Sequence, residues 1–342
     1  MTSETDISFE SSKNKFDIDV KLESYHESDG LDQSILKLKF SGKDFNIKMV
    51  NAMRRVAISN IPVYGFPSEL ITITTNTSIP FNNDYMRLRL SKLPVSNIDP
   101  EIYFLADKHW YKVNYADPER EKHPKEKLVE LYINYNNESS EIVNVTTNDC
   151  QIYIDGEEKK NIYNKKYPVL LIKLKPTEKF QCRMKATFGV AENNTTWTAA
   201  RNAFYDEEKN NFLLTVEGNW QYSEQELMLR VCKFIIHKIY ELKKNLQDKI
   251  NSKEILFEKT IYLTLDRETH TFGELLNYEF QSHKDIAFSG VSKPDFLIKS
   301  MLIKTISKSE KSPLDPMLEC MDILIKKFKH IGAELTKVFK KK

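Results

Sequence analysis

Cysteine and glycine are scarce in this chain of 342 residues, and their placement excludes several kinds of site. The four cysteines, Cys150, Cys182, Cys232 and Cys320, lie far apart and form no CxxC pair, so zinc and redox spacings are absent. The nine glycines include no GxGxxG or GxxxxGKS/T motif, which excludes the common phosphate-binding loops. We therefore expect reduced, mostly buried cysteines in a reducing compartment, with no metal and no cofactor.

Recognisable catalytic motifs are missing as well. The seven histidines include no HExxH or HxH, and no GxSxG sequence is present to form a nucleophile elbow. Adjacent acids such as Glu157-Glu158 and Glu207-Glu208 predict a solvated surface rather than a catalytic pair. A triad assembled from distant residues stays open, so a hydrolase with a dispersed site is the weakest of three functional hypotheses.

Long apolar runs are also lacking. No window approaches the ~20 apolar residues of a membrane-spanning helix. The start MTSETDISFE lacks the basic segment and the apolar core of a signal peptide. We therefore expect an intracellular protein with no membrane partner. A hydrophobic fraction of 40% with 11% aromatic residues suffices for sizeable cores, and the length favours two domains.

Charge is balanced in total and uneven along the chain. Lys plus Arg is 51 against 49 Asp plus Glu, so little or no direct nucleic-acid contact is expected. Residues 1–30 are rich in acids and poor in large apolar residues, which predicts a mobile acidic leader. The last twenty residues carry seven lysines, which favour the negative end of a helix dipole over a nucleic-acid contact.

The first half of the chain predicts a strand, a short helix and further strands. Residues 31–40 alternate in polarity as a strand does, and Asp44 is the expected N-cap of the helix. Apolar residues at three- and four-residue spacing predict the helix, and Pro62 disfavours its continuation. These apolar residues are Phe45, Met49, Ala52, Met53 and Val56. Further strands are expected at 63–66, 70–75, 169–174, 180–188 and 212–216.

Residues 96–165 differ from their surroundings. Strand-like runs at 102–105, 129–135 and 151–154 alternate with loops rich in Asn, Ser, Lys and Glu. This composition predicts an inserted, mainly-β subdomain.

The second half predicts two long helices. Ser223 with Glu226 forms a capping box that opens a helix over 223–247, and residues 248–253 are a polar break. The second long helix covers 316–338, with Asp315 as its N-cap and Pro316 at its first position.

A compact unit lies between these helices. Strands are predicted at 255–265 and 296–306, and Thr271 with Glu274 is a second capping box that opens a short helix. The order of strand, short helix, strands and long helix therefore occurs twice, which implies an internal duplication.

Each long helix carries an apolar stripe that another element must cover. The other unit's stripe is the nearest candidate, so we expect a pseudo-two-fold pair of α+β units within one chain. The expected contact residues are Leu227, Val231, Phe234 and Leu242 on the first helix, and Met321, Leu324, Phe328 and Leu335 on the second.

Asn51, Arg54 and Arg55 form an unusual polar group on the first short helix. Met53 belongs to the buried stripe, so both arginines must project from the flank or the outer face, with Asn51 near Arg55 at i, i+4 spacing. A solvated basic helix side would explain them on charge alone. Two arginines bordered by methionines also suit an interface that pairs them with carboxylates.

At these residues the sequence resembles a known family. DFNIKMVNAMRRVAISNIPVYGF is similar to the assembly motif of the α-like subunits of cellular RNA polymerases: bacterial α, archaeal D and the third-largest eukaryotic subunit. FNNDYMRLRLSKLPV and FQCRMKATFGVAENNTTWTAARNAFY resemble later segments of the same family. ETHTFGELLNYEFQSHKDIAFSGVSKPDF resembles the smaller partner, archaeal L or the eleventh eukaryotic subunit.

The resemblance covers most of residues 31–340 and implies a D/L fusion like those of large DNA viruses. It implies a D-like dimerisation domain at 31–95 and 166–250, an L-like domain at 251–342, and an intramolecular pseudo-heterodimer. It also implies departures from the family: only Cys150 lies near the insert, so the relatives' cysteine-held cofactor is expected to be absent, and Asn277 replaces the first arginine in the second unit.

The function that the resemblance implies is a non-catalytic assembly subunit of a multisubunit DNA-directed RNA polymerase. Its implied partners are the second-largest (β-like) and largest (β'-like) subunits and small subunits resembling the tenth and twelfth eukaryotic ones. Asn51, Arg54 and Arg55 are the implied contact with the second-largest subunit. The implied locations are the host cytoplasm (viral factory) and the virion, with the host nucleus as an alternative. A stand-alone interaction scaffold is the competing hypothesis.

Overall fold

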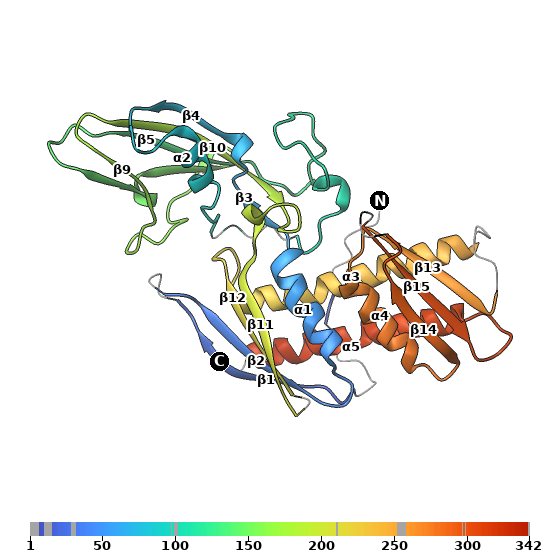
Figure 1. Cartoon of the computed structure of the whole chain (residues 1–342). Helices are drawn as coiled ribbons and strands as arrows, with labels where there is room; N and C mark the ends of the chain where they lie inside the picture. Colours follow the sequence, from blue (N-terminus) through green and yellow to red (C-terminus); the bar gives the residue numbers. More distant parts are fainter. Residues whose placement is uncertain are drawn as a thin grey trace.

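The protein is a mixed α/β chain with five helices and several antiparallel sheets among the described residues of the computed structural model (Figure 1). The described residues are 7–9, 16–28, 32–96, 98, 102–209, 211–251, 258–295, 297 and 299–340. In chain order the elements are β1 (Asp19–His26), β2 (Ile35–Ser41), α1 (Ile47–Ser59), β3 (Val63–Gly65), β4 (Ile71–Asn76), α2 (Asn83–Leu90), β5 (Val129–Asn136), β6 (Val143–Thr146), β7 (Cys150–Ile154), β8 (Glu157–Glu158), β9 (Leu170–Leu174), β10 (Lys179–Gly189), β11 (Ala200–Glu208), β12 (Asn211–Gly218), α3 (Glu224–Asn251), β13 (Thr260–Asp266), α4 (His270–Ser282), β14 (Ile286–Ser292), β15 (Ser300–Ser307) and α5 (Leu314–Lys340).

The first sheet has the order β1-β2-β12-β11 and supports α1. Leu36, Leu38 and Phe40 alternate along β2 and are fully buried, as the sequence pattern predicts. The expected mobile leader is wrong for residues 19–26, because β1 pairs with β2 along its length and buries Val20. Residues 1–6, 10–15 and 29–31 lie outside the described residues.

Helix α1 begins two residues later than expected. Asn46 is the N-cap, and its side-chain oxygen accepts hydrogen bonds from the backbone N–H groups of Lys48 at 2.9 Å and Met49 at 3.1 Å. The predicted cap, Asp44, instead accepts from the backbone N–H of Asp17 at 2.8 Å. A tertiary partner on the segment before β1 therefore replaces the local role that the sequence indicated.

A second hydrophobic core lies beside the first sheet and contains β3 to β10 with α2 (Figure 1). It draws on residues from Tyr64 to Val190, so it extends on both sides of the expected insert at 96–165. Strands β5 and β7 match the predicted runs. The predicted strand at 102–105 is wrong, because these residues form an irregular segment whose side chains are buried.

In the compact second unit α4 packs on the sheet β13-β15-β14, and α5 packs against α4. Strand β14 was not predicted, and residues 255–257, 296 and 298 of the predicted strands lie outside the described residues. The predicted capping box is wrong: Thr269 is the N-cap, and the Thr271 hydroxyl is buried without a hydrogen-bond partner. Helix α5 begins at Leu314, before Asp315 and Pro316, and α3 runs through the predicted break to Asn251.

Helices α3 and α5 lie side by side and join the two units through one hydrophobic core (Figure 1). Their facing stripes are buried, except that Leu242 is half-buried, and Lys243 pairs with Asp322 at 2.5 Å. The buried side chains are Leu227, Val231, Phe234, Met321, Leu324, Phe328 and Leu335. Helices α1 and α4 also pack against each other, and Lys48 pairs with Glu274 at 3.1 Å. None of the described helices is long and apolar enough to cross a membrane.

Truncation of Phe328 should cost much of the fold's stability. Its ring is fully buried in the shared core, so Phe328→Ala should lower the free energy of unfolding by about 3–5 kcal/mol. Tyr278→Ala is the matched control, because Tyr278 is 41% exposed, and it should change stability by less than about 0.5 kcal/mol. Chemical denaturation followed by circular dichroism measures both, and equal effects would contradict a shared core.

The segment before β1 also crosses helix α5. Phe9 is half-buried and packs over Gly332, where an added Cβ would overlap the Phe9 ring. The Lys233 ammonium of α3 lies 6.0 Å from the centre of the same ring. Phe16 meets His330 edge-on at 6.2 Å, and the His330 Nε2 lies 3.3 Å from the Ile18 carbonyl. The segment before β1 therefore packs across α5, the long helix of the second unit. We call this contact the clasp.

A double-mutant cycle tests the contact between Phe9 and Gly332. The effect of Gly332→Ala on stability should change sign when the Phe9 ring is removed. Gly332→Ala should destabilise the wild-type chain by about 1–3 kcal/mol, because the new methyl group displaces Phe9. In a Phe9→Ala background the same substitution should be neutral or stabilising by up to about 1 kcal/mol, because alanine is the better helix former. Thermal unfolding measures both values, and the same cost in both backgrounds would place Phe9 elsewhere.

Candidate subunit-binding surface

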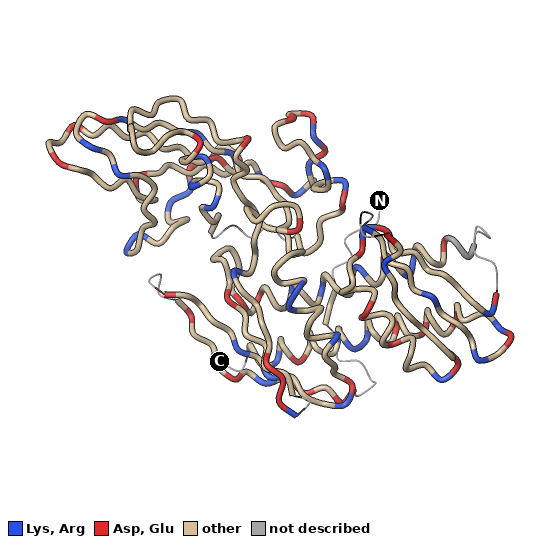
Figure 2. The backbone as a smooth tube through the Cα atoms, in the orientation of Figure 1, with Lys and Arg blue, Asp and Glu red and all other residues tan. Residues whose placement is uncertain are grey.

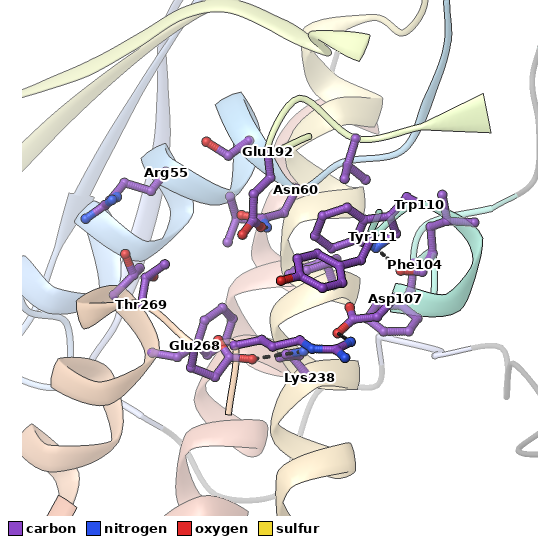
Figure 3. Close-up of a pocket in the computed structure, with 18 of the residues that line it drawn as sticks. Arg55, Asn60, Phe104, Asp107, Trp110, Tyr111, Glu192, Lys238, Glu268 and Thr269 are labelled. Carbon is purple, nitrogen blue, oxygen red and sulfur yellow. Dashed lines mark hydrogen bonds and ion pairs between the residues drawn. The ribbon is translucent and has the colours of Figure 1, made fainter. Parts of the chain in front are cut away.

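Two arginines on α1 project away from the hydrophobic core. Met49, Met53 and Val56 fill the buried side of this helix, so the helical period turns Arg54 and Arg55 to the outside. Arg54 is half-buried and Arg55 is exposed. Figure 3 shows the Arg55 side chain extending away from Trp110 and Tyr111.

Asn51 holds Arg54 in place. Its side-chain oxygen accepts two hydrogen bonds from the Arg54 guanidinium, from Nε at 3.2 Å and from Nη2 at 2.9 Å. The bonded partner of Asn51 is thus Arg54, at i, i+3 spacing, and the expected proximity of Asn51 to Arg55 stays a prediction. Arg54 keeps further N–H donors after these two bonds, so it can still bind a carboxylate.

The charges of these arginines are not neutralised within the described part of the chain. Neither guanidinium forms an ion pair with a described carboxylate, although Lys48 on the same helix pairs with Glu274. Two neighbouring cations on a rigid helix, one of them oriented by a hydrogen-bonded amide, suit a carboxylate-bearing protein partner. Asn277, at the corresponding place of the second unit, is buried and accepts a hydrogen bond from the Ser289 hydroxyl at 2.7 Å.

Behind Arg55 lies a cavity of about 280 Å³ (Figure 3). Its walls come from α1, α3, the segment 104–111 and the start of α4. Three ion pairs connect these elements. Asp107 pairs with Arg267 at 3.0 Å, Lys238 pairs with Glu268 at 2.9 Å, and Glu192 pairs with Lys299.

The Lys238–Glu268 pair lies at the buried side of this cavity. Burial raises the pKa of Glu268 above its ordinary value, even though Lys238 is close. Burial alone would lower the pKa of Lys238, but the charge of Glu268 and its hydrogen bond raise it. The pair therefore joins α3 of the first unit to the loop before α4 in the second.

The irregular segment 102–126 is the structural feature of this region that sequence reasoning missed. Its Ile102 carbonyl accepts a hydrogen bond from Arg230 at 2.8 Å, which fastens it to α3. The Phe104 ring lies 4.1 Å from the His237 ring, centre to centre. The Arg267 guanidinium lies 4.5 Å from the centre of the Tyr111 ring. The sequence pattern predicted a strand at 102–105 and only loop for the rest of this segment.

If residues 102–126 form a bridge that packs firmly against α3, truncation of Phe104 should lower the stability of the fold. Phe104 is 8% exposed, so Phe104→Ala should lower the free energy of unfolding by about 3 kcal/mol and speed amide exchange in residues 102–111. Leu128→Ala, at a position 46% exposed near the end of the same segment, is the control and should have little effect. Equal, small effects would show that the segment is not docked.

The described residues offer no group of side chains suited to hold a metal ion. No cluster of three or more His, Cys, Asp or Glu side chains that could hold a metal ion occurs there. All four cysteines are free thiols, and burial raises the pKa of Cys150 and of Cys182 to about 12. At neutral pH these thiols are therefore protonated and poor metal ligands.

Comparison with known proteins connects this architecture to transcription. The family model of the RNA polymerase Rpb3/Rpb11 dimerisation domain matches residues 260–334, which contain β13, α4, β14, β15 and most of α5. A provisionally named DNA-directed RNA polymerase subunit of Acanthamoeba polyphaga mimivirus is 27% identical over 325 residues, which is 87% of this chain and 89% of that protein. These matches confirm the resemblance that the sequence motifs carry.

Proposed function

We propose that this chain, an α-like RNA polymerase subunit of the Rpb3/Rpb11 type, is the non-catalytic assembly platform of a multisubunit DNA-directed RNA polymerase. The observation that carries the proposal is the pair of unneutralised arginines on α1, beside a core that already joins two units in one chain. In this proposal the units form an intramolecular pseudo-heterodimer, so no second copy is needed before the large subunits bind.

The second-largest subunit binds Asn51, Arg54 and Arg55, and the largest subunit binds afterwards. The Arg54 guanidinium is oriented by Asn51 before binding, so less side-chain entropy is lost when a partner carboxylate docks. The contact lies on the outer side of a helix whose inner side is core, which separates partner binding from folding. Small subunits resembling the tenth and twelfth eukaryotic ones complete the proposed set of partners.

Two competing functions lack such support. A stand-alone scaffold unrelated to transcription is not favoured by either match. A hydrolase would need a nucleophile beside a base, and the charged residues other than Arg55 that line the cavity near α1 instead form three ion pairs.

The proposal is tested by separating folding from assembly. Arg54→Ala with Arg55→Ala should leave the free energy of unfolding of the isolated chain within about 0.5 kcal/mol of wild type. Recruitment of the second-largest subunit should weaken more than about tenfold, because truncating one side of an interfacial charge pair costs about 2–5 kcal/mol. Melting by circular dichroism and quantitative co-purification from co-expressing cells measure the two effects.

Lys37→Ala with Lys39→Ala is the matched control. It removes the same two positive charges, here from the outer face of β2. This variant should therefore have the net charge of the arginine variant and should still recruit the second-largest subunit. Early unfolding of the arginine variant would make the arginines structural, and unchanged recruitment would place the contact elsewhere. Purification of the wild-type chain without large polypeptides would contradict the polymerase function itself.

A further inference from the structure

Strand β4 has an unprotected edge. It pairs with β10 on one side only, and its six residues Ile71–Asn76 contain no charge, proline or glycine. Five of the six residues are β-branched threonine or isoleucine, which favours extended backbone. The Ile71 carbonyl accepts a hydrogen bond from Arg87 Nε at 3.4 Å. Beyond this bond, an edge of this kind offers backbone N–H and C=O groups to another chain.

Several other strand edges in the described part of the chain are protected by charge, by short length or by a covering helix. β1 and β11 carry charged residues, and β11 ends in the acids Asp206, Glu207 and Glu208. Figure 2 shows acidic positions in red at the tip of the hairpin that β11 forms with β12. β8 is only two residues long, and both are glutamates. β14 packs against α4, and the Gln281 side chain donates to the Ser289 carbonyl at 2.8 Å. These are the devices by which proteins prevent unwanted strand pairing.

An open groove of about 650 Å³ runs along this edge, between β4 and α2. Three consecutive residues of β4, Ile71, Thr72 and Ile73, line it. Successive side chains of a strand point to opposite faces, so a groove that touches all three lies along the edge. Helix α2 forms the opposite wall with Arg87 and with Leu88, which is 63% exposed.

The charges of the groove indicate what it binds. Glu69 and Asp84 balance Arg87 and Lys92, and Arg87 is already paired with Asp84 at 3.1 Å. Nucleic acids and anionic lipids require an excess of basic residues, which this groove lacks. An uncharged edge, a neutral wall and an exposed leucine are complementary to an uncharged, partly apolar peptide segment in extended conformation.

We propose that an extended, uncharged segment of another polymerase subunit adds a strand to β4 and packs an apolar side chain on Leu88. This proposal rests on the proposed function, because the occupant belongs to the same enzyme. Main-chain hydrogen bonds to β4 supply the binding energy, and the α2 wall selects side chains at alternate positions. The groove is a second contact, beside the second hydrophobic core, that is separate from Arg54 and Arg55 on α1.

Hydrogen exchange of the isolated chain and of the purified complex tests the groove. Backbone amides of residues 71–76 that point away from β10 should exchange at least about tenfold more slowly in the complex. Leu88→Asp should abolish this slowing, because it places a charge against the apolar side chain of the added strand. Thr72→Lys, which puts a lysine on the exposed edge, should do the same.

Ile142→Asp is the matched control, because Ile142 is 62% exposed on the same region but does not line the groove. It should keep the slow exchange, and all three variants should melt as the wild type does. A complex that forms with residues 71–76 exchanging as in the free chain would overturn the groove and leave the platform function intact. Absence of any complex would overturn both.

Discussion

The contact between α3 and α5 is the constraint on which the rest of the structure depends. Each helix is about seven turns long and carries an apolar stripe that no sheet of its own unit covers completely. Packing the two stripes together fixes the distance between the units and places α1 beside α4. The clasp of Phe9 over Gly332 and the bridge at 102–126 then add contacts that exist only because the helices already meet.

The long helices were predictable because their evidence is repeated along the chain. Six or more apolar residues at helical spacing give the same answer, so an error at one position does not matter. Helix ends were less predictable because they depend on single side chains with competing partners. Asp44 binds the backbone of Asp17 instead of capping α1, and Thr271 lies inside α4 rather than before it.

Strands at sheet edges and the segment 102–126 escaped prediction for a different reason. β1 and β11 carry charges on their outer faces, so half of each strand has the composition of a loop. β1 and β11 each form a hairpin with the strand that follows them, β2 and β12. The sheet that holds both hairpins depends on the pairing of β2 with β12, which are distant in the sequence. The segment 102–126 has no periodicity to detect, because aromatic contacts to α3 and ion pairs to the second unit hold it.

The candidate surface was predictable in position but not in geometry. Helical period alone placed Arg54 and Arg55 opposite the buried methionines, whereas choosing between them as the partner of Asn51 requires side-chain rotamers. For function, this means that different sides of α1 contribute to the free energy of folding and to the proposed free energy of binding. The side of α1 that folds the protein is apolar and buried, and the side that carries charge contributes little to folding. Under the proposed function, a mutation on the charged side therefore alters assembly at nearly constant stability, which a surface built into the core could not allow.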